Sequence, residues 1–204
     1  GAVDFTVSES GTLLYLASAG ETAPGEIVYV SRDGSMTPID SGLTGDFHSL
    51  ALSPDGRRLA ASKVEGTEQQ VWVKQLPDGP LTKLTFEGNR SVRPVWSPDG
   101  NYVGYLGNEG SGQQLYRMRA DGSSPPELVV AYLGRQINEA FWSRDGRWIV
   151  FRTVPNDIFA QRTAGDTSTI PILQSAFDEF TPALSPDGRW LAYMSNESGT
   201  FEVF

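Results

Sequence analysis

The feature that most constrains the fold is a short repeat. The stretch "SPDGRRLA" at residues 53–60 returns three times, as "SPDGNYVG" at 97–104, "SRDGRWIV" at 143–150 and "SPDGRWLA" at 185–192. The turn glycines of these copies are 44, 46 and 42 residues apart, and Gly11, in the weaker copy "SESGTLLYLA", lies 45 residues before Gly56. A fixed period of this length indicates a chain built from one repeated supersecondary unit.

The chemistry of the repeat predicts a tight hairpin turn. Pro54 fixes φ near the value of the second position of a type I turn, and Asp55 tolerates the next position. Gly56 can adopt the left-handed conformation that strains a residue with a Cβ, and the Ser53 hydroxyl can hydrogen-bond the turn amides. We expect the same turn role for Pro98, Asp99, Gly100, Asp145, Gly146, Pro186, Asp187 and Gly188.

Each unit reads as four short extended segments joined by turns. In residues 46–87 these segments are "HSLALS", "RRLAASKV", "QVWVKQL" and "PLTKLTF", and none has helical periodicity. Units of about 40–50 residues with four antiparallel strands are typical of β-propeller blades. We therefore expect an all-β propeller forming one domain over residues 1–204, with blades at about 3–44, 45–87, 88–133 and 134–176 and three strands of a fifth at 177–204.

Aromatic residues recur near the first two strands of the units. Because a single blade has two apolar faces, it is stable only when neighbouring blades cover them. We expect the following aromatic residues to pack between blades: Trp96, Phe141, Trp142, Trp148, Phe151, Trp190 and Tyr193. The last segment, "TFEVF", is expected to form an apolar sheet edge without a partner, which favours pairing with another chain.

The sequence resembles the TolB-type propeller repeat, a relative of the WD repeat. "WSPDG" with "YVGYLGNEGSGQQLYRMRADG", and "ALSPDGRWLAYMSNESGTFEVF", carry this resemblance, which covers essentially the whole chain. It implies a larger ring, since propellers of the family usually have six or seven blades. The chain would then be a fragment of such a ring, present as an open arc, a five-bladed closure with an incomplete last blade, or an assembly through its blade faces.

Two further stretches resemble propellers attached to bacterial serine/threonine protein kinases. These are "VWVKQLPDGPLTKLTFEGN" with "RPVWSPDG", and "SNESGTFEVF". The chain has no glycine-rich ATP loop, "HRD" or "DFG". The resemblance implies a sensor or interaction domain of a receptor-like kinase, facing the periplasm or the cell exterior. TolB-type blades also belong to prolyl-oligopeptidase-like hydrolases, where they gate substrate access, and to the stand-alone periplasmic scaffold TolB.

Composition argues against several other functions. The net charge is −9, which disfavours binding to nucleic acid, and no apolar run is long enough to insert into a membrane. The chain has no cysteine, and His48 is its only histidine, with no G-x-S-x-G motif. We therefore expect no catalysis, no metal site and no cofactor in this chain, and a protein, a peptide or a small polar molecule as its ligand.

The expected binding site lies at one mouth of the propeller. The segments that lead into the first strand of each unit, 45–48, 88–93, 134–139 and 177–180, differ between units, whereas the turns at the opposite face repeat. Variable segments on a constant scaffold are where recognition is usually located. The candidate ligand contacts are Phe47, His48, Arg90, Arg93, Arg135, Asn138, Asp178, Glu179 and Phe180. The loops between second and third strands flank the same mouth and are weaker candidates.

Overall fold

In a computed structural model, the protein is described over residues 5–7, 11–17, 25–40, 43–108, 112–132 and 134–204. These residues form antiparallel strands and no helix. The strands of the first two blades are β1 (Phe5–Val7), β2 (Leu13–Ala17), β3 (Gly25–Val30), β4 (Met36–Pro38), β5 (Thr44–Leu52), β6 (Arg58–Glu65), β7 (Glu68–Gln75) and β8 (Leu81–Lys83). The third and fourth blades contain β9 (Ser91–Trp96), β10 (Tyr102–Asn108), β11 (Gln113–Arg119), β12 (Glu127–Val130), β13 (Gln136–Trp142), β14 (Trp148–Val154), β15 (Ile158–Arg162) and β16 (Ile170–Leu173). A last sheet contains β17 (Glu179–Leu184), β18 (Leu191–Ser195) and β19 (Glu202–Val203).

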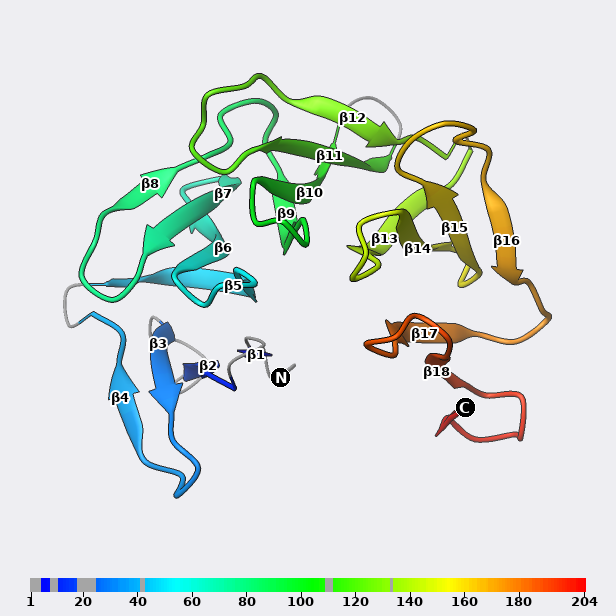
Figure 1. The fold of residues 1–204 in the computed structure, drawn as a ribbon, viewed down its shortest axis with the longest axis horizontal. Coiled ribbons are helices and arrows are strands. Elements are labelled where there is room, and N and C mark those ends of the chain that lie inside the picture. Colours follow the sequence, from blue (N-terminus) through cyan, green and yellow to red (C-terminus); the bar gives the residue numbers. More distant parts are fainter. Residues whose placement is uncertain (1–4, 8–10, 18–24, 41–42, 109–111, 133) are drawn as a thin grey trace.

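The sheets fan out around a common axis (Figure 1). The first strand of each blade lies inside the arc, and the fourth strands β4, β8, β12 and β16 lie outside. Blade 5 (β17–β19) has three strands. Figure 1 shows that the arc is open between blade 1 and blade 5, and the C-terminal end of the chain lies at this opening. The single chain is thus an open arc of propeller blades, and an assembly through the blade faces stays a prediction.

The hairpin turns have the expected geometry. The Gly56 N–H donates to the Ser53 carbonyl at 2.8 Å, and Gly56 has a φ of 71°. The Ser53 hydroxyl accepts the Arg58 N–H at 2.9 Å and donates to the Asp55 carboxylate at 2.6 Å. Gly100, Gly146 and Gly188 have φ between 68° and 70°, so the four copies form one turn.

Each turn also holds a carboxylate that its hydrogen bonds keep ionised. The Ser143 hydroxyl donates to Asp145 at 2.6 Å, and the Arg147 N–H and guanidinium donate to the same carboxylate at 3.0 and 2.7 Å. These bonds lower the pKa of Asp145 to about 2. The serine hydroxyl is likewise the main cause of the lowered pKa of Asp55, Asp99 and Asp187. The acidic residue of the repeat therefore stabilises the turn.

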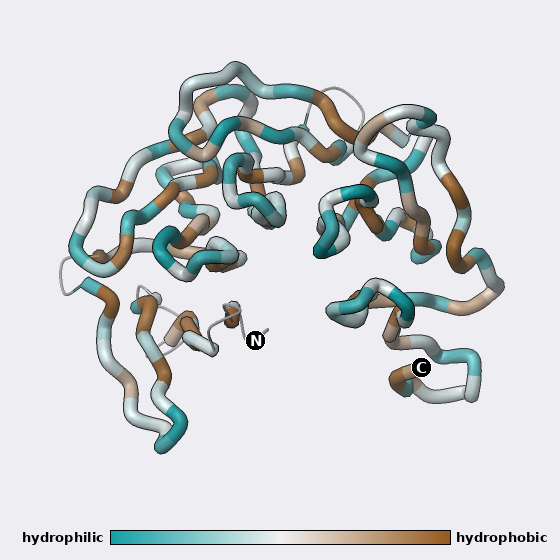
Figure 2. The backbone as a smooth tube through the Cα atoms, viewed as in Figure 1, coloured by the Kyte–Doolittle hydropathy of each residue, from teal (hydrophilic) through white to brown (hydrophobic). Residues whose placement is uncertain are grey.

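The core lies between neighbouring blades, and two tryptophans of the inner strands fill the central interfaces. Trp96 belongs to the cluster that joins blades 2 and 3, and its indole N–H donates to the Ala51 carbonyl at 2.8 Å. Trp142 packs between blades 3 and 4 with Phe151, which is fully buried. Figure 2 shows the hydrophobic residues along the strands and the hydrophilic residues at the turns.

The prediction that Trp190 is a core residue is wrong. Its side chain is 72% exposed, although it stands at the same place in the repeat as Trp148. Trp148 packs beside Leu184 of the next blade, whereas the corresponding face of blade 5 is not covered by another blade in the described structure. Phe141, Trp148 and Tyr193 are partly buried and pack against the cluster between blades 4 and 5.

Two sheet edges have features of their own. The backbone of β3 pairs with the start of β5, through Gly25 with Gly45 and Glu26 with Thr44, and this joins blades 1 and 2 into one sheet. The pairing uses the end of β3 that β4 leaves free.

At the other end of the chain, β19 pairs with β18, and Val203 is 76% exposed. The last segment is therefore an exposed apolar edge.

Candidate functional site

Irregularities in the inner strands shape the mouth where the entry segments lie. The pairing register shifts near the start of β5, β9, β13 and β17, a few residues before each turn serine. At three of these bulges a residue other than glycine has a left-handed φ: Ser49 at 49°, Arg93 at 51° and Thr181 at 47°. Such conformations cost free energy and are enriched at functional sites. The inner strands extend into the expected entry segments: 45–48 lies wholly within β5, whereas 88–93, 134–139 and 177–180 contain the starts of β9, β13 and β17.

A series of polar contacts crosses from blade 3 to blade 4 at this mouth. Arg93 Nη1 lies 3.3 Å from Glu139 Oε1, and Arg152 Nε donates to Glu139 Oε2 at 3.1 Å. Arg152 Nη1 also donates to Asn156 Oδ1 at 2.5 Å. The Arg152 side chain is 3% exposed, so its charge depends on these partners.

The same series continues into blade 5. Asn156 Nδ2 donates to Asp178 Oδ1 at 2.7 Å, and the Asp178 N–H donates to Asn196 Oδ1 at 3.0 Å. Asn156 lies in the β14–β15 loop, and Asn196 lies in the β18–β19 loop. Two of the loops between second and third strands, those of blades 4 and 5, therefore contact the entry segment of blade 5.

Two candidate residues are held inside this mouth by local pairs. Arg135 forms an ion pair with Asp157, and its Nη1 lies 3.4 Å from Thr153 Oγ1. Glu179 is fully buried, and its Oε1 accepts a hydrogen bond from the Ser175 hydroxyl while its Oε2 has no partner among the described residues. Burial raises the pKa of the Glu179 carboxyl. Glu179 is therefore shielded from a ligand by burial, and Arg135 already has a carboxylate partner.

Arg90 differs from the other candidate cations because it has no side-chain partner among the described residues. It is exposed and lines a cavity of about 410 Å³. The wall comes from the β6–β7 loop, the first residues of β7 (Glu68 and Gln69), the entry to blade 3 (Asn89) and the end of β10 (Asn108). The backbone of Arg90 is fixed by a bridge to Gln69 and by the Asn108 N–H, which donates to the Arg90 carbonyl at 3.3 Å. A fixed backbone with an unpaired guanidinium at a polar cavity can bind an anionic group.

The remaining candidates are distributed between core and surface. Phe47 is 2% exposed and belongs to the core between blades 1 and 2, so it does not reach the ligand surface. His48 is exposed, and its Nε2 lies 3.0 Å from Asp46 Oδ1. Asn138 lies at the bulge of β13 and is half-buried. Phe180 is half-buried beneath the Arg152 guanidinium, 5.1 Å from its ring centre.

The sequence prediction missed Glu139 and Arg152 as individual residues of the mouth. Glu139 follows Asn138 directly in the entry segment, but nothing in the sequence pairs it with a residue of another blade. Asn156 and Asn196 lie in the loops named as weaker candidates. Of two more of those loops, 18–26 lies largely outside the described residues and 107–113 does so in part, at 109–111.

Comparison with known proteins assigns the family. The sequence profile of the TolB beta propeller domain matches residues 17–204. The chain belongs to the TolB beta propeller domain family. Among solved structures, a protein of Agrobacterium tumefaciens reported as a TolB superposes with a TM-score of 0.80 at 26% identity, over 98% of this chain and 72% of that one. TolB from Acinetobacter baumannii superposes with a TM-score of 0.78 at 17% identity, over 98% and 50%.

Curated relatives have longer chains. The uncharacterized protein Atu1656 of Agrobacterium fabrum is 29% identical over 201 residues, which is 96% of this chain and 63% of the relative. The uncharacterized peptidase YuxL of Bacillus subtilis is 27% identical over 175 residues, 85% of this chain and 25% of the relative. The TolB-family chain thus spans between a quarter and less than two thirds of these relatives. In the described part of the chain, no helix is long and apolar enough to cross a membrane, and no group of three or more metal-binding side chains is present.

Proposed function

We propose that this TolB-family domain is a non-catalytic recognition propeller that binds a protein segment at the entry mouth. The observation that carries the proposal is the contrast between the two ends of the blades. At one end the same hydrogen-bonded turn recurs, whereas at the other end the charged residues differ from blade to blade. A mouth of varied polar groups on a repeated scaffold suits recognition of one partner.

The proposed ligand is a peptide that carries a carboxylate side chain. Arg90 supports this because its guanidinium is exposed, lines the cavity of about 410 Å³ and has no ion pair among the described residues. The amide groups of Gln69, Asn89 and Asn108 around the same cavity can hydrogen-bond a peptide backbone. By contrast, Arg93, Arg135 and Arg152 already have carboxylate partners.

A peptide selection tests this proposal. Random displayed peptides would be selected on the purified chain, and the enriched sequences would be titrated by calorimetry. We expect Asp or Glu at one position of the enriched sequences, and we expect Arg90→Glu to weaken binding by about tenfold or more, because a charge-assisted hydrogen bond is lost and a repulsion is introduced. Arg57→Glu is the matched control, since Arg57 is also exposed but lies in the turn at the opposite end of blade 2. Equal affinity of both variants for the selected peptides would overturn the proposal.

A second candidate function is supported by the relatives. The likeness to peptidase YuxL, and a TM-score of 0.71 with a prolyl endopeptidase at 16% identity over 99% of this chain, favour a propeller that gates access to a separate hydrolase domain. The kinase-linked propeller is the alternative setting for the first proposal. Sequencing the gene on both sides of this segment distinguishes the two, since a hydrolase domain downstream supports gating and a kinase domain upstream supports a signalling role. Self-association through β19 also stays a prediction, to be measured as solution mass.

A further inference from the structure

Blades 2 to 5 form three successive interfaces, and these interfaces contain different side chains at one position of the repeat. The residue directly before the turn serine is Trp96 in blade 3 and Trp142 in blade 4, but Leu184 in blade 5. Trp142 lies so close to Gly104 of blade 3 that a Cβ there would be 2.4 Å from its ring. Leu184 has no ring to extend over the neighbouring sheet. The interface between blades 4 and 5 therefore has no indole at this position of the repeat, although Trp148 of blade 4 lies in the same interface.

The sheet face opposite Leu184 is also more apolar than the equivalent face of blade 3. In blade 4, Val150 pairs with Ala160 and Ala160 with Ile170, so this row across the sheet is hydrocarbon throughout. The corresponding row of blade 3 runs from Gly104 to Arg117 and Glu127, and the last two form an ion pair at 2.8 Å. Water can cover the outer part of the row in blade 3 at little cost, but it covers the row in blade 4 unfavourably.

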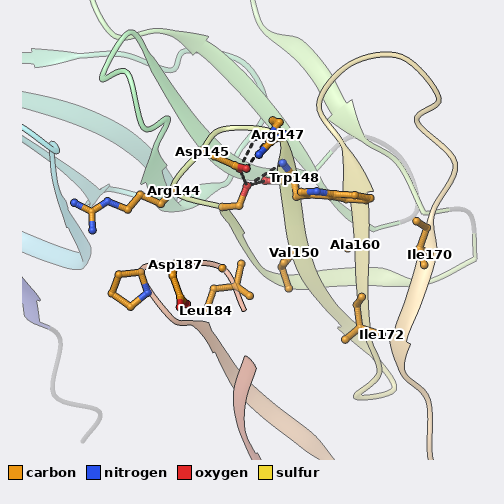
Figure 3. A pocket seen from close by; sticks show the side chains of 13 residues that line it. Arg144, Asp145, Arg147, Trp148, Val150, Ala160, Ile170, Ile172, Leu184 and Asp187 are labelled. Atoms are coloured by element: carbon orange, nitrogen blue, oxygen red, sulfur yellow. Dashed lines mark hydrogen bonds and ion pairs between the residues drawn. The ribbon is translucent and has the colours of Figure 1, made fainter. Parts of the chain in front are cut away.

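A cavity of about 560 Å³ lies at this place (Figure 3). Its apolar wall is made by Trp148, Val150, Ala160, Ile170, Ile172 and Leu184. Ile170 and Ile172 are 43% and 48% exposed, which is unusual for two isoleucines that flank one cavity. Figure 3 shows Trp148 extending from β14 toward Ile170, with Leu184 facing them from blade 5. Cavities of this size that are lined mainly by hydrophobic side chains are typical of small-molecule sites.

The charged groups at the rim already have partners. Arg147 Nε donates to Asp145 at 2.7 Å, and the Ser185 hydroxyl donates to Asp187 at 2.6 Å. Arg144 also has an interaction within the protein, and in Figure 3 its guanidinium extends away from Ile170 and Ile172. A charged ligand would have to compete with these pairs. The cavity therefore favours an uncharged ligand.

We propose that the cleft between blades 4 and 5 is a binding site for a small uncharged aromatic molecule with a bicyclic ring of about the size of indole. The ring covers the outer part of the row, over Ala160 and Ile170, because Val150 stands where blade 3 has Gly104, which leaves room for the ring of Trp142. Trp148 provides an aromatic surface against which the ligand ring packs. The site is separate from the cavity at Arg90, so this inference does not depend on the proposed function.

Methyl NMR with indole as the probe tests the proposal. The isoleucine and leucine methyl groups of the full chain would be labelled and followed during a titration. We expect saturable shifts at Ile170, Ile172 and Leu184, with a dissociation constant of about 1 mM or below for a ligand with so few atoms. Ile137, in the core between blades 3 and 4, is the internal reference and should not shift. Shifts that do not saturate, or that spread equally to Ile137, would overturn the site.

Two variants locate the probe. Leu184→Trp supplies the missing indole from the protein itself, and we expect it to abolish the shifts. Ile172→Ser removes apolar surface at the exposed edge of the cavity and should weaken the binding of indole about fivefold or more. Leu128→Ser is the control, at a 50% exposed position of the outer strand of blade 3, and should leave the binding of indole unchanged. Ile172→Ser decides the question if Leu184→Trp fails to fold by circular dichroism. Binding of indole to Ile172→Ser with the wild-type constant would contradict the proposal.

Discussion

The packing of Trp142 on Gly104 gives the sharpest stability prediction. A Cβ at residue 104 would lie 2.4 Å from Cη2 and 2.5 Å from Cζ3 of Trp142, and 3.2 Å from a methyl group of Val95. Ordinary contact begins near 3.4 Å, so the indole would have to move by about 1 Å in a packed interface. We expect Gly104→Ala to lower the free energy of unfolding by about 1–3 kcal/mol, as is typical of an overpacked core.

Urea denaturation followed by circular dichroism measures this change, and a double-mutant cycle isolates its cause. Trp142→Leu alone removes buried ring surface and should itself destabilise the chain. In the double variant the added methyl group of Gly104→Ala no longer meets a ring, so its cost should fall by about 1 kcal/mol or more relative to the wild-type background. Ala60→Gly is the control at the equivalent place beside Trp96, and it should cost about 1 kcal/mol or less. Strictly additive free energies in the cycle would refute the argument from steric contact.

Three further predictions concern charged groups. Asp145→Asn should lower thermal stability at neutral pH, and the difference from wild type should shrink as pH falls from about 4 towards about 2, because the lowered pKa of Asp145 contributes stability only while its carboxylate is ionised. Glu179→Gln should be as stable as wild type below pH 4.5 and more stable at higher pH. The reason is that the raised pKa of Glu179 means that ionisation of the buried carboxyl destabilises the fold. A difference in melting temperature between variant and wild type that stays constant from pH 4 to pH 8 would contradict this. Lys74→Met should lower the free energy of unfolding, measured by urea denaturation, by about 1–3 kcal/mol. The Lys74 side chain is 4% exposed, and its ion pair with Asp40, at 2.7 Å, links blade 2 to blade 1. An unchanged free energy of unfolding would mean that this ion pair makes no net contribution to stability.

The parts of the structure that depend on nearby residues could be predicted from the sequence. The turn around Gly56 is one such part, since Ser53 and Asp55 supply its hydrogen bonds within a few residues. The exposure of Trp190 could not be predicted, because burial of this position depends on a neighbouring blade and the repeat pattern is the same with or without one. The pairing of Glu139 with Arg93 joins two blades, and a single sequence contains no signal for such a contact.

The candidate ligand contacts differ in burial, and the type of residue alone does not predict which of them are buried. The sequence predicts Phe47 and Glu179 as ligand contacts because aromatic and acidic side chains suit recognition, yet both side chains lie in the interior. A bulge changes the alternation of faces along a strand, so the inward or outward direction of a residue near it does not follow from counting. Phe47 and Glu179 lie within three residues of a register shift in β5 and β17.

The polar series at the mouth combines structural and potential binding roles, and this decides which substitutions are informative. Arg152 is 3% exposed and contacts Glu139 and Asn156, so its removal would take away one of the two arginine partners of Glu139 and disturb the contacts that link three blades. A loss of binding in such a variant would not distinguish recognition from misfolding. Arg90 is exposed and unpaired among the described residues, so a change there alters the charge of the mouth without removing a support of the fold. The structure therefore allows recognition to be tested separately from stability at Arg90, and stability separately from recognition at Gly104.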